Sequence, residues 1–321
     1  MNILKSLCAA VLAFALAGPA AAQTASSKTI RIVVPFPPGG TADILARVLG
    51  QQIAETHGPT IVVENRPGGG TVIATEVVAR AAPDGNTVLL MANSFVINAS
   101  VRDRLPYDPL TSFEPICLMV DSPQILVVNA NSPFKTLADF VTAAKAKPGE
   151  MNYATVGPAT TQHIAFEMLN RAAGIKLTYV PYGGGTPAVT ALIGGHVMAV
   201  LANPSEVMEQ VNAGKLRALA VASRERFALI PDVPTIAEFG FPGFEATAWF
   251  GLVVPAKTPK DTIAQHITMF KNALAAPAVQ SKLAAQGYRS IGVCGEAFGA
   301  HIKQQHDSYA RVIKDANIKP E

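Results

Sequence analysis

The chain has 321 residues, and its 26 basic and 23 acidic side chains give a formal net charge of +3. A balance this close to neutral argues against a nucleic-acid partner and against electrostatic attachment to an anionic membrane surface. Charged residues make up only 15% of the chain and apolar residues 49%, so much of the chain must be interior to the fold.

The first residues carry the pattern of a secretory signal peptide. Lys5 supplies a positive start, Leu7 to Leu16 form an apolar segment too short to span a bilayer, and three alanines end at Ala22. We therefore expect residues 1–22 to be removed near Ala22 on export. This removal leaves 299 of the 321 residues, a length that favours two lobes, and no later window is long and apolar enough to span a membrane.

The stretch 29–47 predicts a buried strand, a rigid turn and the start of a helix. β-Branched residues fill most of 30–34, as in a strand covered on both faces, and the prolines that follow cannot donate ladder hydrogen bonds. Gly39 and Gly40 let the backbone turn tightly and approach a ligand. The free N–H groups and the positive dipole end of the next helix would stabilise an anion without a cationic side chain.

Two interpretations of this turn remain open. It is either an anion-binding cradle or an ordinary strand-to-helix turn in which Thr41 caps the helix. Asp43 has the charge that favours a helix start, and the same charge repels an anion. We therefore expect Asp43 to order the turn rather than to touch a ligand.

The rest of the chain alternates strands with amphipathic helices. Strands are expected at 60–63, 87–91, 151–156, 177–182, 197–202, 216–222 and 247–254, with helices at 72–82, 136–147, 164–172, 187–193, 205–212, 260–275, 277–286 and 296–316. This alternation predicts an α/β fold with parallel, doubly wound sheets, which bind ligands beyond the carboxyl ends of their strands. We expect the segment that contains the apolar runs of 113–128 to cross between the lobes. Residues 224–242 are expected to return the chain to the first lobe.

Polar residues follow several of these predicted strands. Ser94 lies in a polar segment after the strand 87–91, and Asn203 follows the strand 197–202. Residues 157–163 repeat the opening pattern of strand, Gly/Pro turn and helix start, now with hydroxyl side chains. His163 is either a donor to a ligand or a satisfied histidine of the first helical turn. Phe250, within a strand, is expected to serve packing rather than ligand stacking.

Signatures of catalysis and of cofactor binding are missing from the sequence. It contains no nucleophile elbow, Walker loop, zinc-protease motif or Cys-x-x-Cys pair. Gly183-x-Gly185-x-x-Ala188 fits a loose dinucleotide fingerprint, but the next strand does not end in the acid that would hold a ribose. We expect neither a cofactor nor a metal. Cys117 and Cys294 are either bridged or two buried free thiols.

Eight features occur in an order that resembles one receptor family. They are the signal peptide, Pro35–Gly40 with Asp43 and Arg47, Glu64–Gly68, Pro83–Thr87, Val180–Tyr182 with the glycines after it, Gly214–Ala220, Pro231–Thr235 and Trp249–Leu252. With these features the whole chain resembles the solute-binding receptors of tripartite tricarboxylate transporters, the TctC-like or Bug receptors.

The resemblance implies a type II periplasmic binding protein, with two hinged α/β lobes around a ligand cleft. It implies a first lobe of residues 23–122 and 243–321 and a second lobe of 123–242. It also implies a monomer in the periplasm that binds a di- or tricarboxylate, an aromatic carboxylate or an acidic amino acid. The partner that receives this solute would be the membrane permease of the transporter.

In receptors of this kind, one loop from each lobe holds a carboxylate by backbone N–H groups, hydroxyls and ordered water. The matching loops here are Pro37–Thr41 and Thr155–His163, where Pro158 removes one N–H donor. The expected ligand-binding residues are Phe36, Pro37, Pro38, Gly39, Gly40, Thr41, Ser94, Thr155, Gly157, Thr160, Thr161, His163 and Asn203, with Asp43 as support.

Two other function classes compete with the receptor. An exported α/β enzyme acting on a carboxylate would convert the ligand that protects it against heat, whereas a receptor returns its ligand intact. A structural α/β domain without a small-molecule site would show no ligand-dependent shift in melting temperature.

Overall fold

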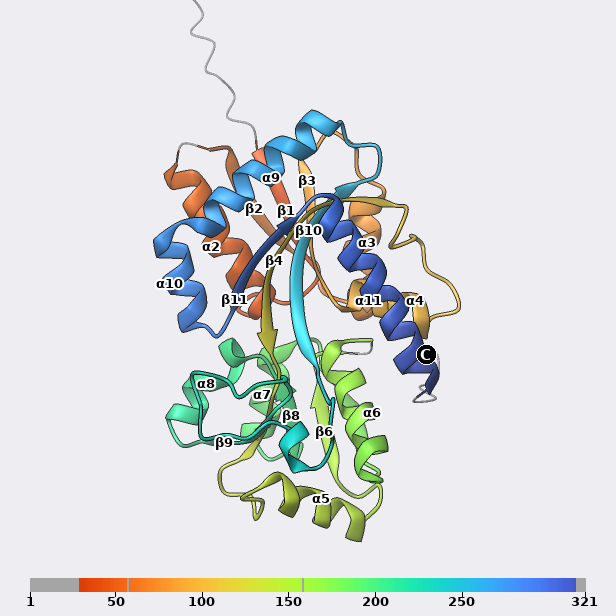
Figure 1. The fold of residues 1–321 in the computed structure, drawn as a ribbon, viewed down its shortest axis with the longest axis vertical. Helices are drawn as coiled ribbons and strands as arrows, with labels where there is room; N and C mark the ends of the chain where they lie inside the picture. Colours follow the sequence, from red (N-terminus) through yellow and green to blue (C-terminus); the bar gives the residue numbers. More distant parts are fainter. Residues whose placement is uncertain (1–28, 57, 158, 316–321) are drawn as a thin grey trace, which may run out of the picture.

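The computed structural model describes residues 29–56, 58–157 and 159–315, so the predicted signal peptide and Pro158 lie outside the described residues. The described chain forms two α/β lobes, one above the other along the long axis of the molecule (Figure 1). Each lobe is built on one sheet. The fold class predicted from the sequence is therefore confirmed.

The first lobe contains a six-stranded sheet in the order β11-β4-β10-β3-β1-β2. Its strands are β1 (Thr29–Val34), β2 (Thr60–Asn65), β3 (Thr87–Ala92), β4 (Phe113–Pro123), β10 (Thr247–Pro255) and β11 (Arg289–Cys294). One face packs against α2 (Thr41–Glu55), α9 (Lys260–Ala275) and α10 (Pro277–Ala285). The other face packs against α3 (Val72–Ala79), α4 (Ser94–Val101) and α11 (Glu296–Asp315). A 3₁₀ turn, η1 (Gly69–Thr71), precedes α3.

The second lobe contains a five-stranded sheet in the order β7-β6-β8-β5-β9. Its strands are β5 (Ile125–Asn129), β6 (Asn152–Thr155), β7 (Thr178–Pro181), β8 (Ala199–Ala202) and β9 (Leu216–Val221). Two helices, α5 (Leu137–Ala146) and α6 (Thr161–Ala173), cover one face. The other face is covered by α7 (Gly185–Ile193) and α8 (Pro204–Asn212), and η2 (Ala237–Phe239) lies on the way back to the first lobe.

The sheets are mixed rather than wholly parallel, which corrects one expectation. β10 is antiparallel to β3 and β4, and β5 is antiparallel to β8 and β9. These are the strands by which the chain enters a lobe from the other one, so they run opposite to strands that end toward the cleft. β4 is followed after one residue by β5, as expected for a segment that crosses between lobes. The expected lobe boundaries, 122/123 and 242/243, remain predictions.

Two local features differ from the sequence-based expectation. Ser94 starts α4 instead of lying in a loop, because the apolar residues that follow it, Phe95 to Ile97, are all buried. β11 was not expected, and it places Cys294 opposite Cys117 of β4. The two cysteines are joined by a disulfide, which decides between the two alternatives left open.

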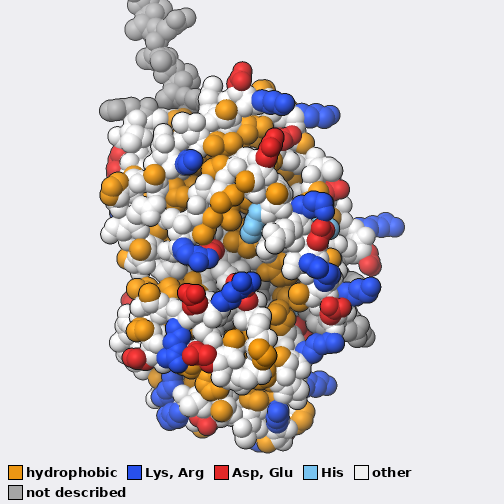
Figure 2. Space-filling view, in the orientation of Figure 1, with side chains coloured by type: hydrophobic (Ala, Val, Ile, Leu, Met, Phe, Trp, Pro, Cys, Tyr) orange, Lys and Arg blue, Asp and Glu red, His pale blue; other side chains and the backbone are white. Residues whose placement is uncertain are grey.

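The distribution of charged side chains over the surface agrees with the nearly neutral charge balance of the sequence. Figure 2 shows acidic and basic side chains interspersed over the face in view. Among the described residues, no helix is long and apolar enough to cross a membrane. Within the same residues, no group of three or more His, Cys, Asp or Glu side chains is arranged to hold a metal ion.

Candidate functional site

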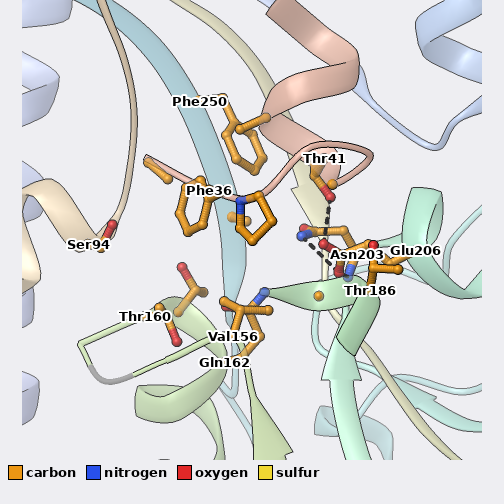
Figure 3. Close-up of a pocket in the computed structure, with 17 residues that line it drawn as sticks. Phe36, Thr41, Ser94, Val156, Thr160, Gln162, Thr186, Asn203, Glu206 and Phe250 are labelled. Atoms are coloured by element: carbon orange, nitrogen blue, oxygen red, sulfur yellow. Dashed lines mark hydrogen bonds between the residues drawn. The ribbon is translucent and has the colours of Figure 1, made fainter. Parts of the chain in front are cut away.

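A cavity lies between the two lobes, where β1, β3, β6 and β8 end. It encloses about 520 Å³ of space not filled by atoms, part of it open to solvent. Both lobes contribute to its wall (Figure 3): Phe36, Pro37, Gly40, Thr41, Ala42, Ala92, Ser94, Ala248 and Phe250 come from the first, and Val156, Thr160, Thr161, Gln162, Gly185, Thr186, Asn203 and Glu206 from the second.

The loop between β1 and α2 presents a helix start to this cavity. Gly40 is the N-cap residue, in an extended conformation and without a side-chain cap, and Thr41 is the first helical residue. The first backbone N–H bonded within the helix is that of Ile44, which donates to the carbonyl of Gly40 at 3.0 Å. The alternative in which Thr41 caps the helix is therefore excluded. Its hydroxyl is free to reach the other lobe.

Asp43 orders this loop without lining the cavity. Its carboxylate accepts hydrogen bonds from the backbone N–H of Gly39 at 2.9 Å, from Arg47 at 2.9 Å and from Asn65 at 3.0 Å. Burial raises the pKa of Asp43, but these hydrogen bonds outweigh it and hold the pKa below the usual 3.8. Because the Gly39 N–H group donates to Asp43, it is not available to a ligand.

The loop between β6 and α6 forms the opposing wall. Thr155 and Thr160 both donate from their hydroxyls to the carbonyl of Gly157, at 3.0 and 2.8 Å, which folds the loop on itself. Thr160 is also the N-cap of α6, since its hydroxyl accepts from the N–H of His163. Thr160 and Thr161 line the cavity at the start of the helix. A second helix N-terminus, from the other lobe, thus borders the same space.

Ser94 adds a third hydroxyl at the start of α4. It is 2% exposed and accepts a hydrogen bond from the Thr71 hydroxyl at 3.2 Å. Figure 3 shows Ser94 and Thr160 on one side of the cavity, with Thr41, Asn203 and Glu206 on the other. Phe36, Phe250 and Val156 lie between these groups. The cavity therefore has two polar ends and a largely apolar middle, where Gln162 lies beside Val156 (Figure 3).

The lobes touch directly at the second polar end. The Thr41 hydroxyl donates to Oε1 of Glu206 at 3.1 Å and lies 2.9 Å from the hydroxyl of Ser205. Tyr288 donates to the backbone carbonyl of Thr41 at 2.6 Å. The two contacts of the Thr41 hydroxyl join the start of α2 to the start of α8, so the cavity wall is continuous from one lobe to the other.

Glu206 is the acidic residue of the cavity wall. Its Oε2 accepts the backbone N–H of Asn203 at 3.1 Å, as a third helical residue does in a capping box. Burial raises the pKa of the Glu206 carboxyl above its usual 4.5, more than the hydrogen bonds from Asn203 and Thr41 lower it. No described lining residue is a Lys, Arg or His.

Eight of the thirteen expected ligand-binding residues line the cavity: Phe36, Pro37, Gly40, Thr41, Ser94, Thr160, Thr161 and Asn203. The other five do not: Pro38 and Gly39 are exposed, Thr155 and Gly157 bond within their loop, and His163 stacks on Tyr179 with 4.4 Å between ring centroids. The expectation for Pro158 lies outside the described residues.

Sequence reasoning missed much of the second polar end. Glu206 belongs to an Asn-x-x-Glu pattern that predicts a helix start, but nothing local indicates that its carboxylate faces the first lobe. Phe250 was assigned to packing, and it both packs in the core and lines the cavity. Gln162 and Thr186 follow a helix start and a glycine run, so polar residues at those places were the available signal.

The comparisons with known proteins agree with this architecture. Residues 45–318 match the family model described as tripartite tricarboxylate transporter family receptor. The chain is 34% identical to Protein BugT of Bordetella pertussis over 324 residues, covering 99% of each chain.

Two solved structures share the whole fold. The periplasmic binding protein BugD is 34% identical with a TM-score of 0.88, covering 91% of this chain and 99% of its own. The R. palustris protein Rpa4515, solved with adipate, is 30% identical with a TM-score of 0.88, covering 91% and 98%. The matched family model spans most of the chain and both lobes, and the chain belongs to the receptor family of tripartite tricarboxylate transporters.

Proposed function

We propose that the protein is a periplasmic receptor that binds a small carboxylate between its lobes and delivers it to the permease of a tripartite tricarboxylate transporter. The observation that carries this proposal is the meeting of two helix starts, those of α2 and α6, at one cavity between the lobes. BugD is named as a periplasmic binding protein, which supports the compartment.

Neutral donors are sufficient to hold an anion in such a cavity. Unpaired N–H groups and the dipole at each helix start favour negative charge, and the hydroxyls of Ser94 and Thr161 add further donors. Hydrogen bonds to a charged group are worth about 1.5–3 kcal/mol each. The free energy needed to close the lobes and order the ligand offsets part of this gain. We therefore expect a micromolar dissociation constant, which corresponds to a binding free energy of about −8 kcal/mol.

A carboxylate ligand is supported by a relative as well as by the cavity. Rpa4515 was solved with adipate, a linear dicarboxylate. By analogy, we assign carboxylate binding here to the cavity residues Gly40, Ser94, Thr160 and Thr161. Hinged lobes would close on the solute and open to release it.

Absence of catalysis is part of the proposal. The described lining residues contain no Cys, His or Lys, and Glu206 is their one titratable side chain. An enzyme that activates a nucleophile needs a base oriented toward it. The hydroxyl–carboxylate pair among the described lining residues is Thr41 with Glu206, and its hydrogen bond joins the two lobes. Binding and release of an unchanged solute therefore fit the cavity better than turnover.

A ligand panel with chemical recovery tests the proposal. The mature chain is melted with di-, tri- and aromatic carboxylates and acidic amino acids, and each stabilising compound is then recovered and identified by mass spectrometry. We expect at least one carboxylate to raise the melting temperature and to be recovered intact. No shift with any carboxylate, or conversion of the stabilising compound, would overturn the assignment.

A further inference from the structure

We infer that Glu206 sets the ligand class at this site: the cavity takes a hydrogen-bond donor of the solute, an ammonium or hydroxyl group, at the Glu206 end and discriminates against a second carboxylate there. This inference rests on the proposed function, in which one carboxylate of the solute lies at the Ser94 and Thr160 end. It specifies which chemical group of the solute lies at each end of the cavity, which the proposed function leaves open.

The carboxylate of Glu206 is fixed in the wall. Oε1 accepts a hydrogen bond from the Thr41 hydroxyl of the first lobe at 3.1 Å, and Oε2 accepts one from the Asn203 backbone N–H of the second lobe at 3.1 Å. Each oxygen is therefore held from a different lobe. The carboxylate also packs directly over Gly185, where a Cβ atom would overlap Oε1. A glycine at 185 therefore makes room for an acid at this place.

The position of this carboxylate is the focus of three helix starts. Thr41 begins α2, Gly185 begins α7, and Glu206 lies in the first turn of α8. Helix starts favour one negative charge, and here the protein supplies that charge itself. The attraction of α7 and α8 for a ligand carboxylate at this end is thereby already used.

No basic side chain compensates for Glu206. Among the described residues it takes part in no ion pair, and the hydrogen-bonding groups that face it are Thr41, Asn203 and, beside Thr41, Ser205. Tyr288, which bonds to the Thr41 carbonyl, is the titratable group next to this cluster. A second carboxylate placed here would meet a like charge, which disfavours its binding.

The opposite polar end has a different character. Ser94 and Thr161 offer hydroxyl donors near two helix starts, and no acidic residue lines that end. A solute with one carboxylate and one donor group matches both ends at once. The apolar middle, with Phe36 and Phe250, accommodates the carbon chain or ring between them.

Matched ligand pairs test this inference by calorimetry at pH 8. The pairs are succinate and 4-aminobutanoate, adipate and 6-aminohexanoate, and terephthalate and 4-(aminomethyl)benzoate. In the pair of best-fitting length, we expect the amino compound to bind at least about tenfold more tightly than the dicarboxylate. Glu206→Gln, which keeps the size and the acceptor oxygen, should reduce that preference by about tenfold or more.

Glu209→Gln is the matched control, because Glu209 lies exposed on the same helix and outside the cavity. It should keep the wild-type preference. Equal or tighter binding of the dicarboxylates by the wild type would overturn the inference while leaving the proposed function intact. Equal weakening of both members of each pair by Glu206→Gln would also overturn the inference and leave the proposed function intact, because it would show that Glu206 only holds the two lobes together. Failure of every carboxylate to bind would overturn the proposed function and the inference together.

Discussion

Thr41 and Glu206, 165 residues apart in the chain, are joined by a hydrogen bond of 3.1 Å from the threonine hydroxyl to the glutamate carboxylate. One residue begins the helix after β1 of the first lobe, and the other lies in the first turn of α8 of the second. The bond closes one end of the cavity between the lobes. Local sequence patterns at either residue show only a helix start, so the cavity arises from the way the lobes meet.

Substitution of Gly40 by aspartate should remove carboxylate binding while the fold persists. A Cβ atom at Gly40 lies 3.6 Å from the carbonyl of Pro37, an ordinary contact, and aspartate is a favoured N-cap residue. The added negative charge faces the cavity, where it repels an anion. We expect calorimetric affinity for the best carboxylate of the panel to fall at least about tenfold.

Gly40→Asn is the control for this charge effect, since asparagine has nearly the same shape and caps a helix equally well. It should retain much more affinity than Gly40→Asp. Undiminished affinity in the aspartate variant would reject the placement of the ligand beside α2.

Substitution of Gly184 by alanine should oppose closure of the lobes. A Cβ atom at Gly184 would lie 2.9 Å from Cδ and Cγ of Pro37, a rigid ring in the other lobe. The free protein can avoid this contact by opening, whereas the closed, ligand-bound state cannot. We expect several-fold weaker ligand binding by calorimetry, with little change in the unfolding free energy of the free protein.

Gly183→Ala provides the comparison, because a Cβ atom at Gly183 meets nothing within 4 Å. That variant should bind as the wild type does. If both alanine variants weaken binding alike, the contact between Gly184 and Pro37 has no part in closure.

Loss of the Cys117–Cys294 disulfide should destabilise the chain markedly. The bridge joins residues separated by 177 positions, so it restricts a long loop of the unfolded chain. We expect the Cys117→Ala, Cys294→Ala double variant to lose about 2–5 kcal/mol of unfolding free energy in denaturant titrations. Reducing agent should lower wild-type stability toward that of the double variant and leave the variant unchanged; equal stability of the two oxidised proteins would contradict this expectation.

The pH dependence of stability should carry the signature of Glu206. Its pKa in the folded protein is raised above the usual 4.5 by burial, so between these two values the folded state binds more protons than the unfolded state. Wild-type stability should therefore fall as pH rises from about 4.5 through the raised pKa, by about 1.4 kcal/mol for each pH unit that separates the two values.

Glu206→Gln lacks this titration, so its unfolding free energy should gain on that of the wild type over the same pH range. The neighbouring phenol of Tyr288 stays neutral there, because burial, chiefly, raises its pKa above the usual 10.0. The unfolding free energies of both proteins are measured by urea denaturation across this pH range. If they change with pH in parallel, folding does not raise the pKa of Glu206.

Much of the fold could be read from residue order. The alternation of strands and helices predicts both lobes. Thr136 and Asp139, at the start of the helix expected at 136–147, form a capping box with reciprocal bonds of 3.1 and 2.9 Å. β11 was missed because its short, glycine-containing sequence around Gly292 has no clear alternation, and a bulge between Ser290 and Val293 interrupts its pairing with β4.

The candidate site could be predicted only where one loop supplies its own chemistry. Gly40, Thr160 and Thr161 stand at glycine- or hydroxyl-rich strand-to-helix turns, and all three line the cavity. His163 has the same local setting, but its ring stacks on Tyr179 instead. Side-chain direction and contacts between lobes decide such cases, and neither is encoded in local spacing.

The most direct measurement of the central claim is a crystal structure of the mature protein with the carboxylate that stabilises it most in the melting panel. The account predicts an intact ligand in the cavity between the lobes, with one carboxylate against the first turns of α2 and α6. A ligand bound elsewhere on the molecule, or density for a reaction product in the cavity, would contradict it.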